Sequence, residues 1–185
     1  IRQAPVFIAW CADRSRLEHA CEQRGYKQNT DYVESFLVAA VDAGLMMQNA
    51  MLAAESLGLG CCYIGAIRNQ TQAVIELLEL PPLVFPISGM TLGTPADNPI
   101  VRPRLDLQAV LHWERYDASG EQALLEAYDQ AMVQTSIYAG RQIEVPGTPG
   151  EVEDYGWREH SARRVSQPRR TELREVLARQ GFGLK

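Results

Sequence analysis

The sequence predicts an α+β fold, in which a few separated strands pack against the helices that dominate the chain. Three observations support this class. A long helical stretch covers residues 31–57, short apolar runs of strand length lie at 4–11, 61–64 and 84–92, and strands and helices do not alternate regularly. Regular alternation would favour a doubly wound parallel sheet, so the α+β class is preferred.

The first strand is predicted at residues 4–11 (APVFIAWC), an apolar run typical of a sheet that is covered on both faces. Residues 14–32 are polar and charged, which indicates a surface helix or excursion.

The stretch of residues 31–57 is predicted to be a helix because it is rich in Leu, Met, Ala and Glu and contains no proline. Its apolar side chains do not fall on one stripe, so the helix must be covered on more than one side. Four polar residues interrupt the run, at Asp42, Gln48, Asn49 and Glu55. They argue against a membrane span. Gly58 is suited to a left-handed cap at the end of the helix.

A short strand is predicted at residues 61–64, followed by a backbone turn at Gly65 and Ala66. Residues 69–72 (NQTQ) resemble a capping box that opens a helix to Leu80, where two prolines end it. The apolar run at 84–92 predicts another buried strand.

The second half of the chain begins with a proline-rich connection at 93–103, and its next stretch, 110–116, is short and mixed. An amphipathic helix is predicted at 121–138, because apolar residues recur there at helical spacing. Residues 142–156 form a long loop that is predicted to be mobile. Residues 157–180 return to helix, with a break near Pro168.

Composition predicts a single domain that covers residues 1–185, since this length supports one proper core. A net charge of −5 argues against nucleic acid as the primary partner. The four cysteines show no CxxC spacing and are predicted to be buried, reduced thiols of a cytoplasmic protein. The chain starts without methionine, just before a strand-like run, and we expect that an N-terminal segment of the domain is missing from it.

Most side-chain chemistries find no support in the sequence. Glycines at 58, 60 and 65 resemble a dinucleotide fingerprint, but a helix precedes them and a strand follows, which is the wrong context. The three histidines (His19, His112 and His160) lack metal-ligand spacing and are predicted to be surface or packing residues. No catalytic side chain and no metal site are therefore predicted. An enzyme of this kind would rely on a cofactor for its chemistry.

Two basic clusters could bind an anion. In Arg102-Pro103-Arg104 the proline favours an extended backbone, so both guanidinium groups project to one side, as a phosphate requires. A solvated pair of surface arginines is the alternative. The second cluster comprises Arg158, Arg163, Arg164, Arg169 and Arg170. It suits a nucleotide phosphate or, equally, a solvated helix face.

The segments QNAMLAAESLGLGCCYIGAIRN and LGTPADNP, with RPR shortly after, resemble the flavin-dependent nitroreductase superfamily. The similar branch contains NADPH-dependent FMN reductases and oxygen-insensitive nitroreductases. The resemblance implies an α+β fold with a mixed central sheet flanked by helices, in an intertwined homodimer that binds FMN at its interface.

The resemblance also implies the site residues. Tyr63, Ile64, Gly65 and Ala66 correspond to the segment against the isoalloxazine ring, and backbone N–H groups there can bond its N5–O4 edge. Arg102, Pro103 and Arg104 correspond to a segment whose basic residues contact FMN. Arg141 lies near, but out of register with, a family arginine used for NADPH, and Arg170 corresponds to another arginine that lines the nicotinamide side.

Two departures from the family pattern matter. Ala66 stands where the family usually has glycine, which would cost about 1 kcal/mol if that residue needs a positive φ. The family's N-terminal FMN-phosphate motif has no counterpart, which accords with the expected missing segment.

The resemblance implies an NADPH-dependent oxidoreductase with a ping-pong mechanism. Hydride passes from NADPH to FMN and then to a nitroaromatic, a quinone or free flavin. Two alternatives belong to other classes: a flavin-binding module without turnover, and a degenerate dimeric interaction protein. The expected partners are a second copy of the chain and a small-molecule acceptor, with no nucleic acid and no membrane.

Overall fold

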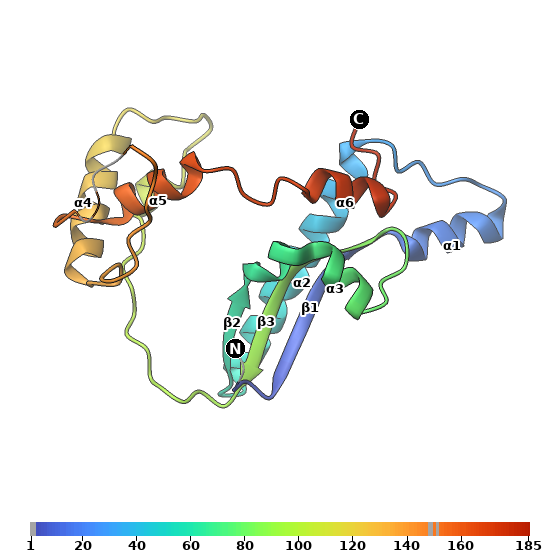
Figure 1. Ribbon diagram of the computed structural model, residues 1–185, viewed down its shortest axis with the longest axis horizontal. Coiled ribbons are helices and arrows are strands. Elements are labelled where there is room, and N and C mark those ends of the chain that lie inside the picture. The colour runs from blue at the N-terminus through green and yellow to red at the C-terminus, as the bar shows by residue number, and fades with distance from the viewer. Residues whose placement is uncertain (1–2, 148–149, 151) are drawn as a thin grey trace. The chain divides into compact units, whose positions relative to one another are not determined.

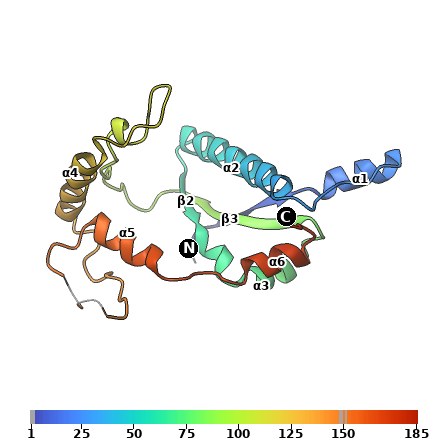
Figure 2. The ribbon, with the colours of Figure 1, turned by 90° about the horizontal axis from the view of Figure 1, so that it is seen from above.

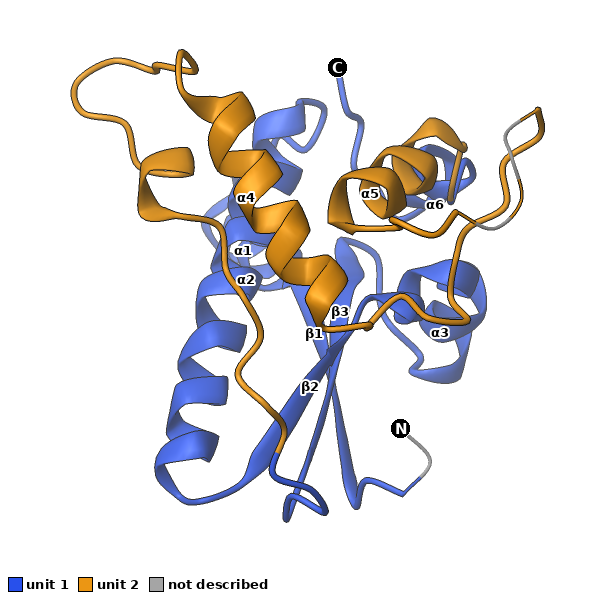
Figure 3. Cartoon of the chain, turned by 90° about the vertical axis from the view of Figure 1, so that its left-hand side faces the viewer, with its two compact units in different colours: residues 1–98, 170–185 blue, residues 99–169 orange. Residues whose placement is uncertain are grey.

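The computed structural model describes residues 3–147, 150 and 152–185 (Figure 1). The chain forms two compact units (Figure 3). Unit 1 comprises residues 1–98 and 170–185, and unit 2 comprises residues 99–169. The single domain at 1–185 stays a prediction, whereas the α+β class is confirmed by the helices and the sheet described below.

Unit 1 is built on a three-stranded sheet with the order β1-β3-β2 (Figure 1). The strands are β1 (Val6–Asp13), β2 (Gly60–Ile64) and β3 (Val84–Gly93), close to their predicted places. β3 pairs antiparallel with both neighbours. β1 and β2 therefore run in the same direction, but β3 separates them, so the described strand pairs are all antiparallel. The expected mixed sheet is corrected in this respect.

Helix α2 (Val33–Ser56) is the long helix predicted from residues 31–57, and it lies along one face of the sheet (Figure 2). Gly58 caps it with a φ of 74°, and the Gly58 N–H donates to the Glu55 carbonyl. The buried side of α2 carries small residues such as Ala39 and Ala43. Large apolar side chains, including Leu45 and Met46, are exposed in the single chain.

Among the described residues, α2 is the one helix long and apolar enough to cross a membrane by length and composition. Four polar residues interrupt its apolar run, and α2 contacts all three strands of the sheet.

Helix α1 (Ser15–Arg24) follows β1 and has no buried residue, in agreement with the predicted surface helix. The four cysteines are free thiols, but Cys62 is exposed and the other three are only partly buried in the single chain. The prediction of buried thiols is therefore wrong for Cys62, and the other three thiols are buried only in part.

The 3-10 helix η1 (Gly65–Gln70) occupies the predicted turn, and α3 (Thr71–Leu77) follows it. The predicted capping box does not form, because the residue before α3, Gln70, makes no side-chain cap. The Asn69 side chain instead accepts hydrogen bonds from Arg170. α3 ends before Leu80, as the segment from Leu78 turns towards Pro81 and β3.

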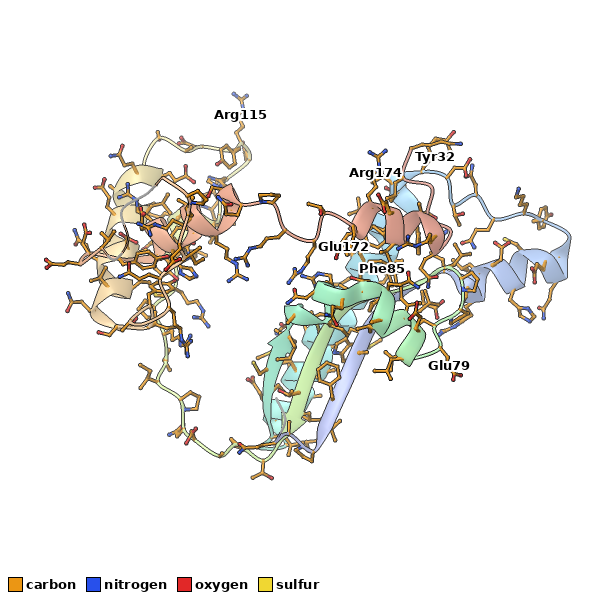
Figure 4. All side chains as sticks on the ribbon, in the orientation of Figure 1. Tyr32, Glu79, Phe85, Arg115, Glu172 and Arg174 are labelled. Atoms are coloured by element: carbon orange, nitrogen blue, oxygen red, sulfur yellow. The ribbon has the colours of Figure 1, made fainter. Side chains whose placement is uncertain are left out.

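The C-terminal segment completes the core of unit 1. Helix α6 (Leu173–Arg179) and α3 lie on the side of the sheet opposite α2 (Figure 2). Phe182 is fully buried and meets the ring of Phe36 edge-on at 5.4 Å, while Phe85 fills the same cluster (Figure 4). Three backbone hydrogen bonds attach the tail beside the start of α2: the Gly183 N–H donates to Thr30, the Lys185 N–H to Asp31, and the Val33 N–H to Lys185.

Unit 2 contains η2 (Leu107–Ala109), α4 (Glu121–Gln134) and α5 (Trp157–Ser166). α4 is shorter than the predicted 121–138, and the predicted helix at 157–180 divides into α5 and α6 on either side of Pro168. The Asp129 carboxylate of α4 accepts the backbone N–H of Arg158 at 2.6 Å and so caps the first turn of α5. The two helices of unit 2 are thereby fixed to one another.

The predicted mobile loop, 142–156, lies in unit 2, and its residues 148, 149 and 151 are outside the described residues. The Gln142 side chain bonds both backbone groups of Val152, at 2.8 and 2.9 Å. The Ile143 N–H donates to the Tyr155 hydroxyl at 3.0 Å. The base of the loop is thus tied together, and its mobility stays a prediction.

Candidate functional site

The predicted FMN turn lies at the end of β2. Tyr63 and Ile64 are the last residues of that strand, and Gly65 and Ala66 open η1. The Tyr63 hydroxyl donates to the Gln48 side chain of α2 at 3.1 Å, which orients the ring on the α2 side of the sheet. Strand β2 and helix α2 therefore position the turn together.

The turn offers backbone N–H groups and open space. The first N–H groups of a helix have no partner within that helix, so Gly65 and Ala66 begin η1 with available donors. Ala66 is exposed and is not among the residues with positive φ, so alanine carries no backbone strain at this position. A Cβ built on Gly65 would meet only the Arg68 guanidinium, at 3.6 Å. This open edge with N–H donors fits a flat ring such as the isoalloxazine of FMN.

Arg68 is a candidate residue that the sequence prediction missed. Its guanidinium lies beside Gly65 and donates to the Ile87 carbonyl of β3. Burial lowers the pKa of Arg68, and the charge of Arg170 lowers it further. The signal in the sequence was its place in the quoted AIRN segment, directly after the buried Ile67.

Arg170 belongs to unit 1 and lies in the same group of residues. Its Nε and Nη2 atoms donate to the Asn69 Oδ1 at 3.0 and 2.9 Å. The structure therefore brings Arg170, a predicted NADPH residue, close to the end of η1 that follows the predicted FMN turn.

The remaining predicted residues lie in unit 2. Arg102 and Arg104 are exposed in a segment without helix or strand, and the Arg104 guanidinium donates to the carbonyl of its neighbour Pro103. Burial raises the pKa of Tyr138, and the charge of Arg102 opposes this shift. Arg141 is exposed, and its backbone N–H bonds the Tyr138 carbonyl at 2.9 Å. Within unit 2, the charge of Arg102 thus acts on Tyr138, and the backbone of Arg141 bonds that of Tyr138. The convergence of Arg102 and Arg104 stays a prediction.

The arginines of the predicted second basic cluster differ in burial and pairing. Arg163 is only 4% exposed and pairs with Glu159 at 2.5 Å, while Arg158 pairs with Glu126 at 3.6 Å. Arg170 belongs to unit 1. Arg163 therefore has a structural role in the fold, and Arg158 has part of its charge offset by a carboxylate.

The prediction that the histidines are packing or surface residues is confirmed. His160 stacks on Tyr138 at 4.3 Å and contacts the Tyr155 hydroxyl through Nδ1 at 3.3 Å. His112 lies against the Tyr116 ring at 4.5 Å, and His19 is exposed. In the described part of the chain, no group of three or more His, Cys, Asp or Glu residues could hold a metal ion.

Comparison with known proteins identifies the family. Residues 1–94 match the nitroreductase family, and residues 102–185 match the C-terminal domain of that family. The FMN reductase [NAD(P)H] of Bacillus subtilis is 43% identical over 185 residues, covering 98% of this chain and 71% of the relative. The oxygen-insensitive NADPH nitroreductase of Salmonella typhimurium is 36% identical over 185 residues, covering 100% of this chain and 71% of the relative.

A solved structure agrees with these relatives. NfrA2 of B. megaterium matches with a TM-score of 0.87 at 38% identity, over 99% of this chain and 71% of the other. The predicted nitroreductase-like fold is confirmed by this likeness. On these matches in sequence and structure, the chain belongs to the nitroreductase family.

Proposed function

We propose that the chain acts as an FMN-dependent NAD(P)H oxidoreductase. The observation that carries this proposal is the open turn at residues 63–66, where the first N–H groups of η1 lie, in a chain of the nitroreductase family. The relatives named as FMN reductase and NADPH nitroreductase support it. FMN, when bound, would supply the hydride chemistry that links oxidation of NADPH to reduction of a nitroaromatic, a quinone or free flavin.

Each unit contains residues that are proposed to contact FMN. Gly65 and Ala66 offer backbone N–H groups to the polar edge of the ring, and Tyr63 and Ile64 form the adjoining strand end. The segment of Arg102, Pro103 and Arg104 supplies positive charge for the phosphate, which guanidinium groups bind through paired hydrogen bonds. Arg141 and Arg170 are proposed to bind NADPH.

The chain's own contribution is placement and electrostatics. Backbone donors fixed at the start of η1 need no reorganisation when charge develops on a bound group. The positive charges of Arg68 and Arg170 lie close to that turn and favour negative charge there. No side chain needs to act as a general base in this proposal.

The proposed assembly is an intertwined homodimer in the cytoplasm. The exposed side of α2 carries large apolar side chains, of which Leu45 is 62% and Met46 is 60% exposed. An apolar surface of this kind is stabilised when a second copy covers it. Sedimentation of the chain should therefore show a dimer, and Leu45→Asp should shift it towards monomer. A monomeric wild type would contradict the proposal.

The central experiment is reconstitution with FMN followed by anaerobic addition of NADPH. The proposal expects retained visible flavin absorbance after dialysis, bleaching by NADPH, and recovery of the colour on addition of a quinone. Flavin retention without bleaching would support the alternative of a binding module. Failure to retain FMN would support the interaction protein.

Arg104→Ala tests the phosphate contact. Loss of a charge-assisted hydrogen bond of about 1.5–3 kcal/mol should weaken FMN binding by roughly ten- to hundredfold. The matched control is Arg115→Ala, which removes an exposed arginine elsewhere in unit 2 (Figure 4). Equal loss of FMN in both variants would argue against a specific role of Arg104.

A further inference from the structure

The contact between Asn69 and Arg170 joins residues 101 positions apart in the chain. Two N–H groups of the guanidinium, on Nε and Nη2, converge on one amide oxygen at 3.0 and 2.9 Å. Two donors on one acceptor fix the in-plane direction of a guanidinium more tightly than a single hydrogen bond would. The Arg170 side chain is therefore oriented by Asn69.

The backbone of Arg170 shows that this position is held rather than free. Its φ of 53° lies in the left-handed region, which residues other than glycine rarely adopt. The Arg170 carbonyl accepts the Leu173 N–H, and the turn that this bond closes leads into α6. A left-handed arginine persists when its surroundings over-determine it. Among the described residues, the side chain that accepts hydrogen bonds from the Arg170 guanidinium is that of Asn69.

The partner that holds Arg170, the Asn69 amide, is neutral, and the charge nearby is the positive charge of Arg68. The positive charge of Arg170 acts on Arg68, and no carboxylate in the described residues lies within 4 Å of either guanidinium. The two cations repel one another, so their proximity needs an acceptor that holds one of them. An aspartate would hold Arg170 equally well but would cancel its charge. The amide of Asn69 holds the guanidinium and leaves its charge available.

We propose that Asn69 is a positioning residue that keeps the guanidinium of Arg170 beside Arg68 in the orientation that binds the phosphate-bearing pyridine nucleotide. The proposal rests on the proposed function, because it assigns to Arg170 the recognition of NADPH. It adds a residue whose role is to orient another and which itself carries no charge.

The test measures NADP⁺ binding to the FMN-loaded protein by calorimetry, beside steady-state kinetics with NADPH. Asn69→Ala should weaken NADP⁺ binding and raise the KM for NADPH by about tenfold, while kcat and FMN retention stay within about twofold of the wild type. Asn69→Asp should keep the guanidinium in place but also weaken NADP⁺ binding, with a smaller dependence on salt, because the carboxylate offsets one cation.

A double-mutant cycle separates positioning from a general structural role. In an Arg170→Ala background, Asn69→Ala should have no further effect on NADP⁺ binding, because nothing remains to be oriented. Gln70→Ala is the matched control, since this neighbour is exposed and makes no side-chain cap hydrogen bond at the start of α3. It should leave binding unchanged.

The proposal is overturned if Asn69→Ala binds NADP⁺ as the wild type does. It is also overturned if the two substitutions are additive, or if the wild type does not bind NADP⁺ at all. A wild type that binds NADP⁺ but does not oxidise NADPH would instead refute the proposed function, while the binding cycle would still decide the role of Asn69.

Discussion

Phe182 offers the sharpest test of how unit 1 is held together. The ring is fully buried, and its backbone N–H bonds the Leu177 carbonyl, so the residue is fixed at the end of α6. It meets Phe36 of α2 at 5.4 Å with an interplanar angle of 74°, and Phe36 meets Phe85 of β3 at 5.7 Å. One ring thus connects the C-terminal segment with the long helix and the sheet.

Replacing Phe182 by alanine removes this connection. Truncation of a buried phenylalanine costs about 3–5 kcal/mol, and the edge-on pair with Phe36 favours the upper half of that range. Against a total unfolding free energy of about 5–15 kcal/mol, this is a large fraction. For a chain of this length, the melting temperature should fall by about 6–20 °C.

Urea unfolding followed by circular dichroism measures the loss directly. Phe182→Leu should lose less, because it keeps most of the apolar volume. Tyr26→Ala is the control, since that ring is 74% exposed and should change the unfolding free energy by less than about 0.5 kcal/mol. A loss below about 1 kcal/mol for Phe182→Ala would refute the view that the C-terminal segment is part of the unit 1 core.

Two further predictions concern unit 2. Asp129→Ala should lower its stability by about 0.5–2 kcal/mol because α5 loses its cap, while Asp129→Asn should keep most of it; equal losses in thermal melts would contradict the capping role. Burial, and then the charges of Arg164 and Arg169, lower the pKa of His160. Between the ordinary pKa of about 6.5 and the lower folded value, the unfolded chain binds more protons, so stability should fall as the pH drops through that range. His160→Phe keeps a ring against Tyr138 without titrating. Melting temperatures compared above and below that range should drop less for the variant, and an equal drop would exclude His160 as the cause.

Local patterns in the sequence predicted most elements of secondary structure. The lack of proline and the density of helix formers predicted α2, and Gly58 predicted its left-handed cap. Apolar runs predicted β1 and β3 to within two residues at either end. These features depend on neighbours within one helical turn or one strand, which is why the chain order alone specifies them. The quoted motifs likewise indicated the family, which the comparisons confirm.

Contacts between distant residues were decided by the tertiary structure. Asn69 was predicted to cap α3, yet its side chain binds Arg170, because a guanidinium brought from far along the chain competes for the same oxygen. Arg163 looked like any arginine of a basic stretch, but its burial beside Glu159 follows from the packing of α5. Local periodicity contains no information on which distant group arrives at a given atom. The sequence by itself therefore determined the elements and the family, while tertiary packing determined that β3 lies between β1 and β2 and that Arg68, Asn69 and Arg170 meet beside the turn at residues 63–66.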